Sequence, residues 1–153
     1  MKTSLFNNIL ELMIPEGFVM NENNIRYPYK DKPPVIMTNE DIQTDLTFNR
    51  LEKSLTVGEV KAAVKEILFL LEDRKDMERV SDYHFFRGEN VSGYWIFFIN
   101  RGVYGNRYNC MTVFPTRNKF TMITMGTYYE NRRVGKNVFK EVITTIRDKT
   151  RSF

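Results

Sequence analysis

Six consecutive apolar residues at positions 94–99, Tyr-Trp-Ile-Phe-Phe-Ile, constrain the fold more than any other part of the sequence. Successive side chains of a β-strand point to opposite faces of the sheet, so a strand of this composition is apolar on both faces. Such a strand is typical of sheets whose two faces are both covered by other parts of the protein. We therefore expect residues 94–100 to lie in a sheet between two covering layers.

This stretch is one of four consecutive segments with the composition of strands, which occupy residues 80–86, 94–100, 107–114 and 119–127. Turn-forming residues separate the four segments, at positions 88–90, 102–106 and 115–118. Short links of this kind join neighbouring antiparallel strands. Nearer the N-terminus the same reasoning predicts three further strands, at residues 4–14, 35–37 and 45–51. The chain is therefore expected to form a largely antiparallel sheet of about six to seven strands.

Two amphipathic helices complete the expected fold. The first begins at Thr56, because Thr56 and Glu59 have the spacing of a capping box, which binds the free N–H groups at a helix start. Its apolar residues recur every three or four positions and form one stripe: Val57, Val60, Val64, Ile67 and Leu71. The second helix is expected over residues 132–151, with a stripe of Val134, Val138, Phe139, Val142, Ile143 and Ile146 and a basic last turn of Arg147, Lys149 and Arg151.

Together these elements predict the α+β fold class, as a three-layer α/β/α sandwich with one helix on each face of the sheet. A short helical turn is also expected at residues 21–25. The sequence contains no repeat, no low-complexity tract and no linker rich in Gly, Ser or Pro. We therefore expect residues 1–153 to form a single domain, which is a usual length for one.

The expected location is the cytoplasm. No stretch approaches the roughly 20 apolar residues that span a bilayer, so no membrane insertion is expected. Residues 1–14 include Asn7, Asn8 and Glu11, where a signal peptide has an unbroken apolar run. Cys110 is the single cysteine, so an intrachain disulfide is excluded.

The formal charge is distributed unevenly along the chain. Residues 1–76 carry a net charge of −3 and residues 77–153 a net charge of +7. A basic half attracts nucleic acid, anionic lipid or acidic protein, so nucleic-acid binding through the C-terminal half is one hypothesis. The bases form no continuous run, and we favour the alternative that they line solvated faces of helices and strands.

No set of residues predicts a catalytic or metal site. His84, the single histidine, has Asp82 two positions away and is the residue on which an enzyme hypothesis centres, but one polar contact within a strand explains it as well. Cys110 lies in an expected central strand and is interpreted as a buried apolar residue. One His and one Cys are too few for a usual zinc site, and no phosphate-binding glycine motif occurs, so no cofactor is expected.

The remaining candidate is a set of aromatic and arginine residues around one predicted hairpin: Tyr94, Arg101, Tyr104, Arg107 and Tyr108. Tyr and Arg often anchor protein interfaces, so these five residues are the candidate partner-binding site. Exchange of Arg107 for Glu together with Tyr104 for Ala is expected to weaken partner capture and to leave the fold intact. The alternative is that the rings are half-buried on the faces of the sheet.

Several short motifs resemble those of PsbP-like proteins. Residues 13–18, Met-Ile-Pro-Glu-Gly-Phe, resemble the opening of these proteins, and Tyr27-Pro28 with residues 34–36 resembles the segment that leads to the next strand. Residues 38–41 and 46–48 are similar to the following hairpin, and residues 93–94 and 108–111 to the central strands. The resemblance covers most of the chain and implies an α/β/α sandwich. It is strongest to small, stand-alone bacterial members.

The resemblance implies binding and not catalysis. The superfamily includes a photosystem II subunit, a small Ran-binding nuclear import factor and the effector-associated chaperones of type VI secretion, and no family site motif is present here. We therefore expect a non-catalytic macromolecule-binding or chaperone-like module with a protein partner, which includes a second copy of the chain. The alternatives are a nucleic-acid-binding protein and an enzyme that uses His84.

Overall fold

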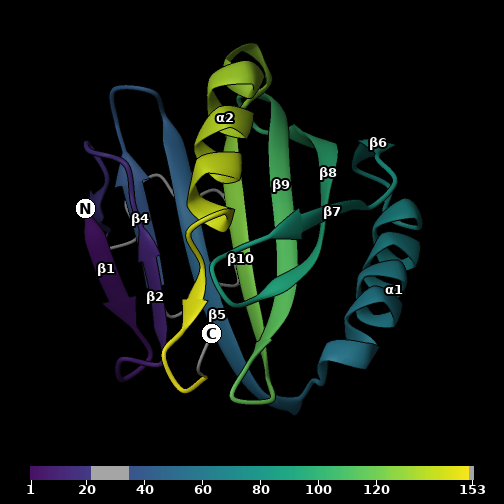
Figure 1. The fold of residues 1–153 in the computed structure, drawn as a ribbon. Coiled ribbons are helices and arrows are strands. Elements are labelled where there is room, and N and C mark those ends of the chain that lie inside the picture. The colour runs from purple at the N-terminus through teal and green to yellow at the C-terminus, as the bar shows by residue number, and fades with distance from the viewer. Residues whose placement is uncertain (22–34, 152–153) are drawn as a thin grey trace.

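The computed structural model describes residues 1–21 and 35–151, which form a large antiparallel sheet, a small sheet and two α-helices (Figure 1). In this part of the chain the large sheet has eight strands, in the order β3-β4-β5-β10-β9-β8-β6, with β7 also paired to β8. Its strands are Val19–Met20 (β3), Val35–Asn39 (β4), Thr44–Ser54 (β5), Met77–Val80 (β6), His84–Arg87 (β7), Ser92–Gly102 (β8), Gly105–Thr116 (β9) and Lys119–Tyr128 (β10). The small sheet has the order β1-β2-β11, formed by Lys2–Leu5, Leu10–Met13 and Arg147–Asp148.

Each α-helix follows a short 3-10 turn. The turn η1 (Val57–Glu59) leads into α1 (Val60–Glu72), and η2 (Tyr129–Asn131) leads into α2 (Arg132–Ile143). As the sequence predicts, Thr56 and Glu59 form a capping box before the first helix. The Glu59 carboxylate accepts hydrogen bonds from the backbone N–H of Thr56 at 3.0 Å and from the Thr56 hydroxyl at 2.8 Å. No described helix is long and apolar enough to cross a membrane.

The alternating side chains of β8 belong to two different hydrophobic clusters. Trp95 and Ile99 lie in a cluster with three residues of α2, namely Phe139, Val142 and Ile143. Ile96 and Phe98 lie in the other cluster, with three residues of α1, namely Val60, Val64 and Leu71. The expected apolar character of both faces of this strand is thus used in packing.

Two predicted strands are wrong in their extent. Residues 4–14 contain the end of β1, a turn and β2, because Phe6, Asn7 and Asn8 have φ of 55°, 56° and 65° and reverse the chain. The predicted strand at 80–86 is divided into β6 and β7. Between them, Ser81 donates its backbone N–H to the Phe97 carbonyl at 2.9 Å and accepts the Phe97 N–H at its hydroxyl at 2.8 Å.

The second helix is shorter than predicted. It ends at Ile143, where the hydroxyls of Thr144 and Thr145 donate to the carbonyls of Glu141 at 2.9 Å and Val142 at 2.7 Å. The chain then becomes extended and β11 pairs with β2, so the basic residues from Arg147 onward do not form the last turn of a helix. The helical turn expected at residues 21–25 lies, except for Asn21, outside the described residues.

Helix α2 lies close to strand β10 at Gly135. A Cβ atom at this position would lie 2.8 Å from Thr127 Cγ2 and 2.9 Å from Met125 Sδ, both in β10. Contacts this short force neighbouring atoms to move, so Gly135 sets the distance between α2 and the sheet.

We predict that Gly135→Ala lowers the free energy of unfolding by about 1–3 kcal/mol. The added methyl group overpacks the contact with β10, and this cost is larger than the stability gained from the higher helix propensity of Ala. Gly58→Ala in η1 is the matched control, since nothing lies within 4 Å of its added Cβ. Urea unfolding followed by the fluorescence of Trp95 measures both changes. Equal stability of the two variants would contradict the close approach.

Candidate functional site

Two of the five predicted site residues are exposed at the turn between β8 and β9. Tyr104 occupies this turn with 86% of its surface exposed, next to Val103 with 91% exposed. Arg101 lies at the end of β8 and is also exposed, where its guanidinium donates to the Glu78 carboxylate at 2.8 Å and to the Lys75 carbonyl. We call Arg101, Val103 and Tyr104 the hairpin tip.

Arg107, in contrast, is buried. Its guanidinium lies 3.7 Å from the Asp45 carboxylate of β5 and 5.1 Å from the centre of the Tyr128 ring. It reaches Asp45 by passing over Gly126 of β10, where a Cβ atom would lie 3.0 Å from Arg107 Nη2. Arg107 Nε has no hydrogen-bond partner among the described residues. Burial raises the pKa of Asp45, although the Thr38 hydroxyl at 2.7 Å and Arg107 act in the opposite direction.

Tyr94 and Tyr108 do not join the hairpin tip in one surface. Tyr108 is buried, and its ring packs against Phe97 at 5.5 Å between ring centres. Tyr94 is half-buried in the other hydrophobic cluster, 5.4 Å from the ring of Tyr83. The structure therefore brings Arg101 and Tyr104 together and separates them from the other aromatic residues of the predicted set.

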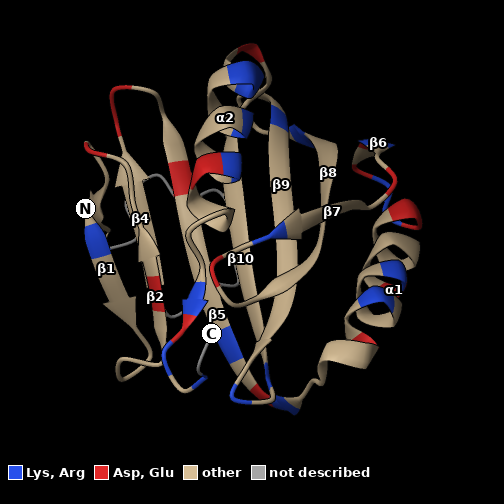
Figure 2. Cartoon of the chain, viewed as in Figure 1, with Lys and Arg blue, Asp and Glu red and all other residues tan. Residues whose placement is uncertain are grey.

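The end of the sheet that carries the hairpin tip also carries the start of α2. Tyr128 pairs with Arg107 in the ladder of β10 and β9, so the next residues of the chain lie at this end. Arg132 stacks on the ring of Tyr129, 4.1 Å from its centre, and both side chains are exposed. These residues add an aromatic and basic surface near the hairpin tip, and Figure 2 shows the basic residues of α2 at this end.

His84 and Cys110 have different environments. His84 is exposed on β7 and its ring packs on Trp95 at 4.6 Å, with no carboxylate against it in the described part of the chain. Cys110 is fully buried, and burial raises the pKa of its thiol to about 12. A thiol of this pKa stays protonated at neutral pH and is a poor nucleophile. Among residues 1–21 and 35–151, no three His, Cys, Asp or Glu side chains come together as a metal site.

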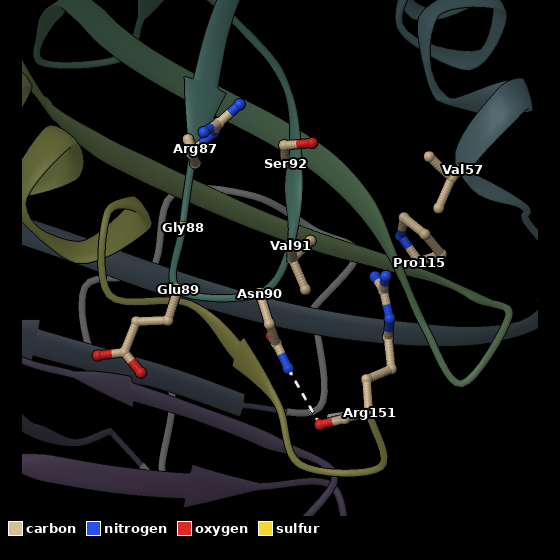
Figure 3. Close-up of a pocket in the computed structure, with 9 residues that line it drawn as sticks. All are labelled: Val57, Arg87, Gly88, Glu89, Asn90, Val91, Ser92, Pro115 and Arg151. Carbon is tan, nitrogen blue, oxygen red and sulfur yellow. Dashed lines mark hydrogen bonds between the residues drawn. The ribbon is translucent and has the colours of Figure 1, made fainter. Parts of the chain in front are cut away.

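Two adjoining pockets lie at the opposite end of the sheet, and sequence reasoning missed both. One has a volume of about 320 Å³ and includes Arg87, Asn90, Ser92 and Arg151 in its lining (Figure 3). The other, of about 420 Å³, includes Arg117, Asn118 and Thr150. Both pockets are also lined by Val57, Pro115 and Arg151, so we describe them together as the arginine groove. Turn signals near residues 88–90 and 115–118 were the only indication in the sequence.

The fold, but not the sequence, is similar to solved structures. No family model matches the chain, and no curated protein matches it either. The solution structure of cyanobacterial PsbP from Synechocystis has a TM-score of 0.64 and 12% identity, with 97% of this chain and 91% of that chain covered.

Two further solved structures have the same fold. The Ran-binding protein Mog1p of Saccharomyces cerevisiae has a TM-score of 0.56 and 9% identity, over 97% of this chain and 94% of that chain. LpqN of Mycobacterium tuberculosis, which is involved in cell envelope biogenesis, has a TM-score of 0.58 and 9% identity, over 90% of this chain and 82% of that chain. The chain therefore has a Mog1p/PsbP-like fold, which confirms the resemblance found in the sequence.

We predict that Arg107→Glu destabilises the protein, so this exchange does not leave the fold intact as the sequence suggested. It replaces the cation beside Asp45 by a second buried carboxylate, and disrupting a buried pair costs about 3–5 kcal/mol. Arg101→Glu is the matched control, because an exposed pair contributes about 1 kcal/mol or less. Urea unfolding of both variants measures the difference, and a similar loss in both would contradict the buried position of Arg107.

We also predict that Cys110 does not react with a thiol reagent such as iodoacetamide in the folded protein at neutral pH. Its thiol is buried and protonated, so alkylation requires unfolding. Mass spectrometry of the protein after treatment with and without denaturant measures this. Rapid alkylation of the native protein would show that the thiol is accessible and would restore Cys110 as a candidate reactive residue.

Proposed function

We propose that this protein is a non-catalytic protein-binding module that contacts its partner through the hairpin tip. The observation that carries this proposal is the exposure of Val103 and Tyr104, at 91% and 86%, on adjacent positions of one turn. Neither side chain belongs to either hydrophobic cluster of the fold. Water is in contact with both, so their burial against a partner would be favourable.

The residue types at this end of the sheet support an interface. Tyr and Arg dominate the contacts that contribute most to binding, and an aromatic anchor is most effective when polar groups surround it. Tyr104 is such an anchor, with Arg101 beside it and Tyr129 and Arg132 at the same end of the sheet. The exposed Arg132 on the ring of Tyr129 favours a partner with acidic groups around an apolar pocket.

Two further points support the proposal. One solved structure of this fold is a Ran-binding protein, so the fold is compatible with protein binding. We also infer that α1 and α2 cover opposite faces of the sheet, since they pack on alternate residues of β8. With both faces covered, the ends and edges of the sheet provide the surfaces for a partner. We propose that the partner is a protein, which includes a second copy of this chain, and that binding takes place in the cytoplasm.

We predict that Val103→Ser with Tyr104→Ser weakens partner binding by about tenfold or more, because truncation of a central interface residue typically costs about 2 kcal/mol. Thermal unfolding should be unchanged, since both residues are exposed. Phe69→Ser is the matched control, because Phe69 is 72% exposed on α1, outside the hairpin tip. The wild type, the double variant and Phe69→Ser are each used as bait for affinity purification from the native cell. Mass spectrometry then identifies the partners that only the double variant fails to recover.

Equal recovery of all partners by the double variant would contradict the role of the hairpin tip. Light scattering measures the molar mass of the wild type and of the double variant. If the partner is a second copy of the chain, the wild type is a dimer and the double variant is a monomer. Recovery of nucleic acid alone, lost at high salt, would favour the basic C-terminal half as the functional region. In the part of the chain that the structure describes, His84 packs its ring on Trp95, and this contact does not favour an enzyme centred on His84.

A further inference from the structure

We propose that the arginine groove binds a small organic oxyanion, in which a phosphate or carboxylate is attached to an apolar group. The groove lies at the end of β9 that contains Pro115, whereas the hairpin tip lies before Gly105 at the other end of this strand. The two sites are therefore separate, and the proposal does not depend on the function proposed for the hairpin tip.

Within residues 1–21 and 35–151, no carboxylate forms an ion pair with the arginines of the groove. Elsewhere in the described chain, Arg74, Arg101 and Arg107 each pair with Asp or Glu at 2.7 to 3.7 Å. Arg87, Arg117 and Arg151 come from three distant parts of the sequence, and none has a carboxylate partner among the described residues. Like charges that line one groove give it a positive local potential, which an anion in the groove would lower.

The two acidic residues that line the groove do not supply this anion. Asp148 is fully buried, and its carboxylate accepts hydrogen bonds from the backbone N–H of Arg117 at 3.0 Å, the backbone N–H of Thr150 at 2.9 Å and the Thr150 hydroxyl at 2.6 Å. Glu89 is exposed, and its side chain points away from Arg87 and Arg151 (Figure 3). The described lining of the groove therefore has an excess of positive charge, which favours an added anion.

The groove is held in shape before any ligand binds. Asn90 joins the β7–β8 turn to the C-terminal segment, because its side-chain amide donates to the carbonyls of Asp148 at 2.8 Å and Arg151 at 3.3 Å and its oxygen accepts the Asp148 N–H at 2.8 Å. Arg117 and Asn118, at φ of 49° and 59°, form the tight turn between β9 and β10. A site assembled in advance loses less entropy when it binds a ligand.

The remaining lining determines the kind of anion. Arginine recognises phosphate and carboxylate groups through paired N–H donors, so either group fits the charge. Val57, which is 60% exposed, and Pro115 form an apolar wall in both pockets. A volume of about 320 Å³ in the first pocket is within the roughly 300–1,000 Å³ of small-molecule sites. An anion with an apolar group uses both parts of the lining.

The test is an NMR titration of the full chain at low ionic strength, which limits the screening of the arginines. The probes are inorganic phosphate, phenyl phosphate and benzoate. We expect saturable shifts of the backbone amides of Gly88, Ser92 and Asn118, with an organic anion bound more tightly than inorganic phosphate. Arg87→Ala and Arg151→Ala should each weaken binding about tenfold, as expected for loss of a charge-assisted hydrogen bond.

Arg133→Ala is the matched control, because Arg133 is an exposed arginine on α2 and does not line either pocket. Tighter binding of phenyl phosphate than benzoate would identify phosphate as the ligand group, and the reverse order would identify carboxylate. Shifts that do not saturate, or that Arg133→Ala reduces as much as Arg151→Ala, would overturn the proposal. The Val103→Ser with Tyr104→Ser variant should bind the anion normally, which separates failure here from failure at the hairpin tip.

Discussion

The two apolar faces of β8 are the constraint on which the rest of the structure depends. Each buried apolar side chain stabilises the fold by roughly 1.5–3 kcal/mol, so neither face can remain in water. Trp95 and Ile99 pack with α2, while Ile96 and Phe98 pack with α1. The segment before α1 brings Val57 to the arginine groove, and η2 before α2 brings Tyr129 to the end of the sheet that carries the hairpin tip.

Local patterns predicted the strands and helices well but not their ends. The central strands were found because alternation and turn residues are both local properties of the sequence. The end of α2 was missed because Ile146, which continues the helical spacing of apolar residues, is also fully buried after the chain becomes extended. The hydroxyls of Thr144 and Thr145 compete for the backbone at this point. The turn at Phe6 to Asn8 was missed for a similar reason, since apolar residues continue on both sides of it.

The sites were less predictable, because they depend on the register of strands that are distant in sequence. Tyr104 lies in the turn that local signals at residues 102–106 predict, and Arg101 lies next to this turn at the end of β8. Arg107 was expected at the surface, but its burial requires Gly126 on β10 and Asp45 on β5 in one line. The arginine groove brings together Val57, Pro115 and Arg151, which are far apart in the sequence. No local pattern predicts that such distant segments meet.

The buried pair of Arg107 and Asp45 is tied to the register of the strands that it joins. Removing both charges from water costs energy that their attraction only partly returns, and Arg107 Nε is left without a partner in the described structure. The pair nevertheless connects β9 with β5 across Gly126, and a slip of one residue in β9 would move Arg107 to the other face. Because β9 begins directly after the turn, this register also determines which residues occupy the hairpin tip. A cost at Arg107 therefore helps to hold Val103 and Tyr104 in their exposed positions.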